Sequence, residues 1–280
     1  MPSVVIAAHN EESVIGACLR ALYRADPAAQ VIVSANGCSD RTAAIATDAG
    51  VLVVDRAEPG KAGALNAAEV IASVFPRIYL DADIVVPPDG ISGITEAFGP
   101  GILAVVPRRR IDTQGRPWPV RGYFAINERL PAFRRGLFGR GMIAVSEEGR
   151  ARFDSFPDMV ADDLFLDSQF GDDEKAIAHG VEVVIAAPHT TGDLIRRLVR
   201  VRRGNAEMRA AAARGELPIS VRQADRWAWL RDVVIPNPSL ALAAVPFLAI
   251  TVIAARRARR APAPGAEWGR DESTRESTRA

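Results

Sequence analysis

The chain has 280 residues, 48% of them hydrophobic, which suffices for one large α/β domain with an appendage and excludes intrinsic disorder for most of its length. Its 35 basic and 34 acidic residues leave a formal net charge of only +1, so no overall attraction to nucleic acid is expected. Two cysteines are too few for a disulfide framework or a zinc site. Because a strand-like run begins almost directly at the start of the sequence, no signal peptide is expected.

The first 107 residues alternate short β-branched runs with segments of helical period, the pattern of a parallel sheet with crossover helices. Strands are expected at residues 3–8, 30–35, 51–54, 78–80 and 103–107. Helices are expected at residues 12–23, 41–49 and 62–74. Ligands of open α/β sheets bind outside the carboxyl ends of the strands. The sequence therefore predicts a site at residues 9–11, 36–40 and 81–83.

The second half is less regular. Residues 108–110 and 115–118 are expected to be loops, and residues 142–146 and 181–187 to be strands. Helices are expected at residues 161–170 and, rich in arginine, at residues 193–214.

Residues 233–255 carry no charge over 23 positions, the length that a bilayer crossing needs. Three prolines weaken a straight helix: Pro236, Pro238 and Pro246. Four arginines follow at once: Arg256, Arg257, Arg259 and Arg260. A simple crossing would place this cluster outside the cell, against the usual bias. We therefore expect a re-entrant or interfacial segment, preceded by a linker or amphipathic segment at 216–232 and followed by a basic, then disordered, tail at 256–280.

Asp81 and Asp83 flank one small residue directly after an apolar run. Mg²⁺ and Mn²⁺ typically take one or two protein carboxylates and complete their shell with water and phosphate oxygens. The pair therefore suits a metal-bound diphosphate. Such pairs also occur in turns and helix caps, so the neighbouring motifs decide between the two interpretations.

Three further motifs accompany this pair in a fixed order. They are His9-Asn10-Glu11-Glu12 after the first strand, Asn36-Gly37-Cys38-Ser39-Asp40 after the second, and Gly60-Lys61-Ala62-Gly63-Ala64-Leu65-Asn66 at a helix start. Together with Asp-x-Asp they resemble glycosyltransferase family 2 over residues 3–205. The resemblance implies a GT-A type fold, which is a mostly parallel sheet flanked by helices with a Rossmann-like nucleotide-binding half.

The resemblance also implies a nucleotide-sugar site. Ala8, Glu11, Asn36 and Asp40 would hold the base and ribose, and Lys61 would lie near the base and diphosphate. Asn36 stands where aspartate is usual. An amide keeps a donor and an acceptor but loses the charge. Asp81 would contact both donor and metal.

A reaction site is implied further along the chain. Gly139-Arg140-Gly141-Met142-Ile143 resembles the strand of small residues under the acceptor site, and Asp162-Asp163 resembles the Glu-Asp motif of the family. The second carboxylate of that motif is the general base, which assigns this role to Asp163 and a supporting role to Asp162. Helix capping is the structural alternative for the pair.

An arginine-rich helix and a histidine complete the resemblance. Arg200-Val201-Arg202-Arg203-Gly204 matches a Gln/Arg-x-x-Arg-Trp helix of membrane-associated members, with glycine in place of tryptophan. Arg200 and Arg203 would neutralise the leaving nucleotide. In some relatives a histidine close to the position of His189 completes the metal shell. The resemblance therefore implies a metal site formed by Asp81, Asp83 and His189.

These features imply an inverting hexosyltransferase that uses Mg²⁺ or Mn²⁺ and transfers sugar from a nucleoside-diphosphate sugar to a hydroxyl acceptor, either lipid-linked or a polysaccharide precursor. The catalytic domain would span residues 1–215 and work at the cytoplasmic face of the cell membrane, with the membrane surface and not nucleic acid as partner. A retaining transferase of the same fold is one alternative. A catalytically silent nucleotide-binding membrane adaptor is another, and the presence of Asp81, Asp83, Asp163 and Arg203 argues against it.

Overall fold

The structure is a computed structural model that describes residues 1–159, 161–217, 221 and 225–260. The chain forms two compact units. Unit 1 consists of Met1–Arg110 and Leu137–Ile185, and unit 2 of Ile111–Gly136 and the described residues from Ala186 onward. This division into units differs from the predicted organisation, in which a catalytic domain spans residues 1–215.

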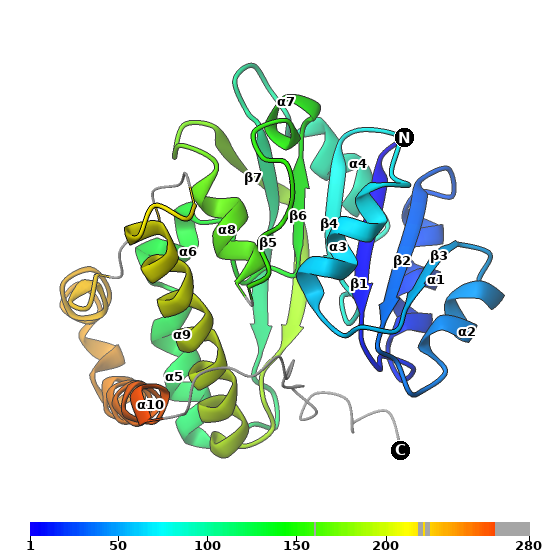
Figure 1. Cartoon of the computed structure of the whole chain (residues 1–280). Helices are drawn as coiled ribbons and strands as arrows, with labels where there is room; N and C mark the ends of the chain where they lie inside the picture. Colours follow the sequence, from blue (N-terminus) through cyan, green and yellow to red (C-terminus); the bar gives the residue numbers. More distant parts are fainter. Residues whose placement is uncertain (160, 218–220, 222–224, 261–280) are drawn as a thin grey trace. The chain divides into compact units, whose positions relative to one another are not determined.

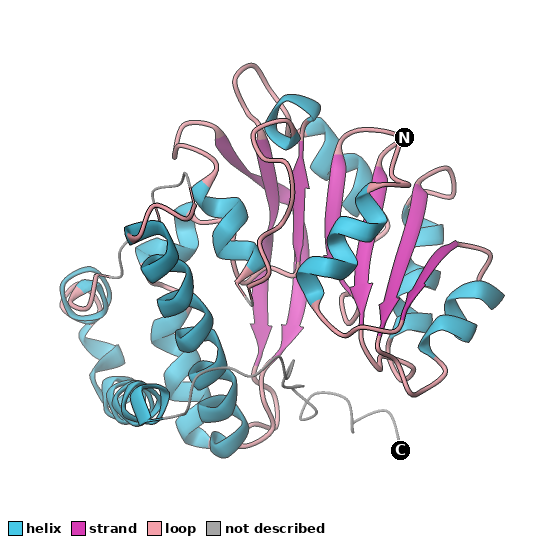
Figure 2. Ribbon diagram, in the orientation of Figure 1, coloured by secondary structure: helices cyan, strands magenta, loops and turns pink. Residues whose placement is uncertain are grey.

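A seven-stranded sheet forms the centre of unit 1, in the order β3-β2-β1-β4-β6-β5-β7 (Figures 1 and 2). Its strands are β1 Ser3–Ala8, β2 Gln30–Asn36, β3 Leu52–Arg56, β4 Arg77–Asp81, β5 Ala104–Asp112, β6 Met142–Val145 and β7 Lys175–Ala186. β1 is parallel to β2 and β4, and β2 is parallel to β3. β6 is antiparallel to β4 and β5. The expected mostly parallel sheet is therefore confirmed.

Helices cover both faces of this sheet. They are α1 Ile15–Ala25, α2 Thr42–Asp48, α3 Lys61–Glu69, α4 Gly90–Glu96, α7 Glu147–Arg150 and α8 Asp162–Ser168. Successive strand residues point to opposite faces, and Val4 and Ile6 of β1 pack in one core with α1 and α4. α3 lies on the opposite face (Figure 1). The carboxyl ends of β1, β2 and β4 therefore meet at one edge, beside the start of α3.

The expectation of a loop at residues 108–110 is wrong, because β5 continues to Asp112. Three consecutive arginines read as loop in the sequence. In the sheet, however, Arg108 and Arg110 are exposed and both pair with Glu182 of β7, at 3.6 and 3.0 Å. The loop expected at 115–118 ends one residue early, because Trp118 begins a helix that has Pro119 in its first turn, where proline is tolerated.

Unit 2 is helical. It contains α5 Trp118–Asn127, α6 Pro131–Arg135, α9 Thr191–Ala213, a π-helix Trp229–Val234, a 3₁₀ turn Pro238–Leu240 and α10 Ala241–Arg260. Phe247 and Ile250 of α10 are buried in one core with Val120 and Tyr123 of α5 and Leu194 of α9. Residues expected in a separate membrane segment therefore share a core with residues expected in the catalytic domain.

Pro246 does not interrupt α10. It packs on α5 at Gly122, where an added Cβ would lie 2.6 Å from the Pro246 ring, so glycine is required for this close approach.

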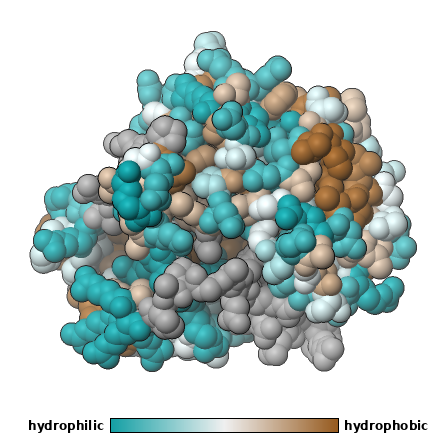
Figure 3. Space-filling model, viewed as in Figure 1, coloured by the Kyte–Doolittle hydropathy of each residue, from teal (hydrophilic) through white to brown (hydrophobic). Residues whose placement is uncertain are grey.

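The segment 216–232 is only partly described, and its end enters the π-helix. Arg256–Arg260 belong to α10, and the disorder expected for 261–280 lies outside the described residues. The face seen in Figure 3 is largely hydrophilic, with one compact hydrophobic patch.

Candidate active site

The loops after β1 and β2 are joined by side chains that accept backbone N–H groups. Asn10 adopts a left-handed conformation with φ 54°, which asparagine tolerates, and its Oδ1 accepts from the Ser39 and Asp40 amides at 2.6 and 3.3 Å. Asp40 in turn accepts from the Glu12 amide at 3.1 Å and the Thr42 amide at 3.0 Å. The two loops expected to hold base and ribose thus form one connected edge.

Asn36 ties this edge to α3. Its Nδ2 donates to the Ala8 carbonyl at 2.8 Å, and its Oδ1 accepts from the Gly60 amide at 3.0 Å. A carboxylate could not donate to the Ala8 carbonyl, which explains an amide at this position. Because Asn36 is fully buried, the structure shows its side chain bonded to backbone inside the protein. Glu11 is also buried, and its amide donates to Thr42 Oγ1 at 2.7 Å.

Lys61 joins the two acidic motifs. It is the first residue of α3, and its Nζ lies 2.8 Å from Asp81 Oδ1 and 2.9 Å from Asp162 Oδ2. Burial alone would lower the pKa of Lys61, but the charges of Asp162 and Asp81 outweigh this effect and hold that pKa above its usual range. Three residues singled out from distant parts of the sequence therefore meet at one ammonium group.

The Gly139–Gly141 turn provides a second connection. The Asp81 amide donates to the Gly141 carbonyl at 2.8 Å, and the Gly139 amide donates to Asp163 Oδ2 at 3.1 Å. Both glycines have positive φ, 68° and 70°, and a Cβ at Gly141 would lie 2.5 Å from Ile84 Cδ1. The small residues of this motif thus have a steric cause. They allow one turn to contact both Asp81 and Asp163.

Asp163 lies in the first turn of α8. Its Oδ1 accepts from the Leu164 amide at 2.8 Å. Burial, and after it the charge of Asp162, raises the pKa of Asp163 to about 6, which places this carboxylate close to the range useful for a base at neutral pH. The residue before the helix is Ala161, and neither aspartate forms a side-chain cap there. Both also contact residues outside α8, so capping alone does not explain the pair.

The residues at the end of β4 fit a divalent cation. The Asp81 side chain is 46% exposed and Asp83 is exposed, and two carboxylates are the usual protein share of an Mg²⁺ or Mn²⁺ shell. A Cβ at Gly141 would come within 3.6 Å of Asp81 Oδ2, so glycine leaves space beside this oxygen. Over the described residues, no three or more His, Cys, Asp or Glu side chains form a group that could hold a metal. Asp81 and Asp83 belong to unit 1 and His189 to unit 2, and the metal-binding role of these three residues stays a prediction.

His189, Arg200 and Arg203 belong to unit 2 and are characterised only within it. The Nε2 atom of His189 is buried and has no hydrogen-bond partner in the described part of the chain. Arg200 and Arg203 are partly buried on α9, which begins with a capping box between Thr190 and Asp193. Gly204, where the motif has tryptophan, is buried in the same helix.

Two asparagines that shape the site were not assigned a role from the sequence. Asn10 joins the first two loops. An asparagine in a loop after a strand could have indicated this role, because asparagine tolerates a left-handed backbone conformation. Asn66, the last residue of the Gly-Lys motif, forms hydrogen bonds to the backbone of Phe156. No local signal predicts this contact, because the two residues are 90 positions apart.

Comparisons with known proteins identify the fold and the family of the chain. None of the curated proteins matches the sequence. The fold is similar to the mannosyltransferase PcManGT from Pyrobaculum calidifontis, solved with GDP-Man and Mn²⁺, with 21% identity, a TM-score of 0.60, and coverage of 94% of this chain and 76% of that one. It is also similar to TarS from S. aureus, solved with UDP-GlcNAc, with 15% identity, a TM-score of 0.50, and coverage of 73% and 66%.

At these identities the likeness shows the fold, which confirms the expected GT-A type. The sequence pattern of glycosyl transferase family 2 matches residues 3–149, more than half of the sequence. The chain therefore belongs to glycosyl transferase family 2 and is a glycosyltransferase.

Proposed function

We propose that this glycosyltransferase is an inverting, metal-dependent enzyme that moves a hexose from a nucleoside-diphosphate sugar to a hydroxyl of a lipid-linked acceptor or polysaccharide precursor. The observation that carries the proposal is the junction of Asp81, Lys61 and Asp162-Asp163. Lys61 contacts Asp81 and Asp162 within 3 Å, and the Gly139–Gly141 turn contacts Asp81 and Asp163. A diphosphate-binding carboxylate and a base thus lie at one edge of the sheet, as transfer between two substrates requires.

Asp163 acts as the general base. An acceptor hydroxyl is a poor nucleophile, so its proton passes to the Asp163 carboxylate as its oxygen attacks the anomeric carbon. The bond from that carbon to the diphosphate oxygen breaks on the opposite face, and its electron pair leaves with the nucleotide. The configuration at the anomeric carbon is therefore inverted.

Basic groups and a divalent cation balance the charge of the leaving diphosphate. Asp81 and Asp83 would hold Mg²⁺ or Mn²⁺, with His189 as a third ligand, and the bound cation would neutralise phosphate oxygens. Lys61, Arg200 and Arg203 would contact the donor, with arginine favoured for its two-pronged binding of phosphate. The structure of PcManGT holds GDP-Man and Mn²⁺, which supports a nucleotide sugar and a divalent cation as the ligands of this chain.

A thermal-shift panel of UDP-, GDP- and dTDP-sugars tests donor binding. With Mn²⁺ present, a donor at about 100 times its Kd should stabilise the fold by about 2.7 kcal/mol, and EDTA should abolish the shift. No shift with any donor would contradict the proposal, and the same shift with EDTA would contradict the metal. Product stereochemistry by NMR then separates the two mechanisms, since an anomer of retained configuration would indicate the retaining alternative.

We also propose that α10 lies in the membrane interface at the cytoplasmic face. Pro238–Arg260 is long and apolar enough to cross a membrane, and an 18-residue window within it has a mean hydropathy of 2.1. One side of α10, with Phe247 and Ile250, is buried against α5 and α9, whereas Leu242 and Val245 are 78% and 62% exposed. A helix packed on one side and apolar on the other suits an interface better than a crossing surrounded by lipid.

The arginines at the end of α10 predict binding to anionic lipid. Each arginine near an anionic surface contributes about 1 kcal/mol, so the protein should float with phosphatidylglycerol vesicles and more weakly with phosphatidylcholine vesicles. Replacing Arg256, Arg257, Arg259 and Arg260 by serine should abolish this preference. Replacing the exposed Arg20 and Arg24 of α1 by serine is the matched control and should not change it. Equal flotation of all three proteins would contradict the interfacial role.

A further inference from the structure

The helix α3 contacts the segment from Arg150 to Asp162, which leads into α8, at three residues. Along α3, Lys61 pairs with Asp162 at 2.9 Å, Asn66 bonds to Phe156, and Glu69 pairs with Arg150 at 2.9 Å. The order of the partners, 162, 156 and 150, is the reverse of the order along α3. The helix and the segment therefore run antiparallel, connected at both ends and in the middle.

The middle contact is a clamp on one residue's backbone. Asn66 Nδ2 donates to the Phe156 carbonyl at 2.9 Å, and Asn66 Oδ1 accepts from the Phe156 amide at 2.8 Å. The described residues between α7 and α8 form no helix or strand, so no backbone ladder fixes them. Side-chain contacts such as this clamp must therefore set the path of the segment.

Aromatic packing connects Phe156 to α8. The Phe156 side chain is buried, and its ring lies 5.3 Å from that of Phe153 and 5.8 Å from that of Phe165. Phe153 also meets Phe165 edge-to-face at 5.2 Å. Phe165 is on α8, two positions after Asp163. Displacement of Phe156 would therefore move the packing under the turn that carries the base.

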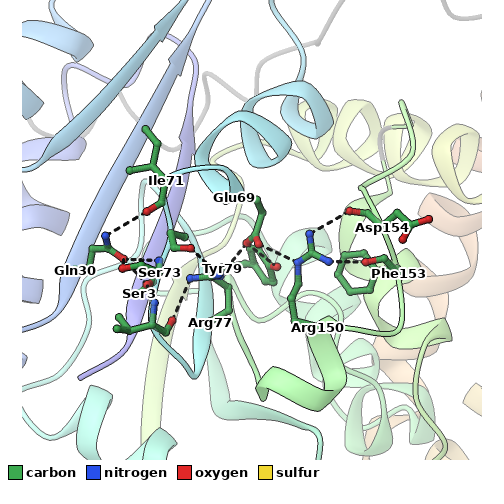
Figure 4. Close-up of polar contacts among 12 residues, drawn as sticks. Ser3, Gln30, Glu69, Ile71, Ser73, Arg77, Tyr79, Arg150, Phe153 and Asp154 are labelled. Carbon is green, nitrogen blue, oxygen red and sulfur yellow. Dashed lines mark hydrogen bonds and ion pairs between the residues drawn. The ribbon is translucent and has the colours of Figure 1, made fainter.

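A buried ion pair anchors the far end of the segment (Figure 4). Glu69 Oε2 accepts from Arg150 Nε at 2.9 Å, and Glu69 Oε1 lies 3.1 Å from Arg77 Nε and 2.9 Å from the Tyr79 hydroxyl. The Arg150 guanidinium also donates to the carbonyls of Phe153 and Asp154. Because the Glu69 side chain is only 9% exposed, water does not compete strongly for these contacts.

We propose that Asn66 is a positioning residue for Asp163, acting through the Phe156 backbone and the aromatic cluster, with Glu69 as the second anchor. This inference rests on the proposed function for the role of Asp163. It assigns two tasks to the Gly60–Asn66 motif: Lys61 contacts the acidic residues of the site, and Asn66 fixes the segment that presents the base.

Gln30 provides a matched control for Asn66 within the same unit. Its Oε1 accepts from the Ser73 amide at 3.0 Å and its Nε2 donates to the Ile71 carbonyl at 3.3 Å (Figure 4). Gln30 is therefore also a side-chain amide that clamps the backbone of a loop. Its loop, however, precedes β4, and among the described residues no hydrogen bond or ion pair joins this loop to α8.

Hydrogen exchange on the ligand-free protein tests the clamp directly. Asn66→Ala should speed exchange of the α8 amides and of residues 151–159, while Gln30→Ala should speed exchange only near residues 71–76. Asn66→Asp keeps the size and the acceptor for the Phe156 amide but cannot donate, so it should show a smaller effect of the same kind. Unchanged α8 exchange in both Asn66 variants would overturn the proposal.

Kinetics with the donor selected by the thermal-shift panel test the consequence. Asn66→Ala should lower kcat about 100-fold, the loss expected for a misplacement of roughly 1 Å, with the donor KM and the affinity for the free nucleotide with Mn²⁺ unchanged. Gln30→Ala should lower Tm but not kcat. Equal kcat losses in the two variants, or lost nucleotide affinity in Asn66→Ala, would overturn the positioning role. Absence of transfer by the wild type would instead count against the proposed function, and the exchange experiment would still decide on the clamp.

Discussion

Asp163→Asn should abolish sugar transfer while leaving donor binding intact. The amide has nearly the same shape as the carboxylate but cannot accept the proton of the acceptor hydroxyl, and loss of a general base typically costs about 10²- to 10⁴-fold in rate. Single-turnover transfer and calorimetry with the donor measure the two quantities separately. Asp162→Asn is the matched control and should be milder. A larger loss in Asp162→Asn would mean that the base is the first carboxylate of the pair.

The pH dependence gives a second readout of the same assignment. Because burial raises the pKa of Asp163 to about 6, the wild-type kcat should fall as the pH drops below about 6, where the base becomes protonated. A group whose folded pKa lies above its unfolded value of about 3.9 favours the folded state when protonated. The ionised Asp163 therefore lowers the free energy of unfolding as the pH rises through about 6.

The Asn variant should change stability only slightly at neutral pH. It removes the cost of the buried charge, but an amide has one acceptor oxygen where Asp163 accepts from both the Gly139 and Leu164 amides. One backbone N–H then faces an NH₂ group, which lowers the free energy of unfolding by about 1–3 kcal/mol. Removal of the buried charge acts in the opposite direction. A loss of cooperative unfolding in Asp163→Asn would indicate a structural residue instead of a base.

The sequence predicts the sheet of unit 1 well, because its strands are buried β-branched runs and polar residues mark where each strand ends. Both signals are local in the sequence. It fails where a long-range contact decides. Arg108 and Arg110 belong to β5, whose neighbour in the sheet is β7, and their ion-pair partner Glu182 lies on that strand, far along the chain. Likewise, the apolar residues of α10 indicate a membrane segment, and only their packing on α5 shows that one side is already covered.

The candidate site shows the same division. The types and order of Asp81, Lys61 and Asp162-Asp163 are visible in the sequence, and the structure brings Asp81 and Asp162 together at the Lys61 ammonium. The burial of Asn36 is not visible, because it depends on the Ala8 carbonyl and the Gly60 amide approaching from two other segments. Roles assigned by motif position alone thus do not distinguish side chains that face a ligand from side chains that hold the loops together.

Asp83→Ala should abolish the metal dependence of donor binding. Asp81 is paired with Lys61, so its replacement would also release the lysine and confuse the result, whereas Asp83 is exposed after the same strand. Loss of an outer-shell partner typically weakens metal binding about 10- to 100-fold, and a direct ligand should reach at least the upper end of that range. Calorimetry of donor binding with Mn²⁺ and with EDTA measures the difference.

The matched control for this prediction is Asp89→Ala, which removes another exposed carboxylate at the start of α4, in the segment that follows β4. It should keep the full Mn²⁺ dependence, because Asp89 is outside the Asp81-Ala82-Asp83 motif. With EDTA, the wild type and both variants should bind the donor equally weakly, since the carboxylate contributes through the cation alone. Asp81 and Asp83 also flank a turn in which the Ile84 amide donates to the Asp81 carbonyl at 3.1 Å. If Asp83→Ala keeps the wild-type response to Mn²⁺, this pair of carboxylates belongs to a turn and the divalent cation is held elsewhere.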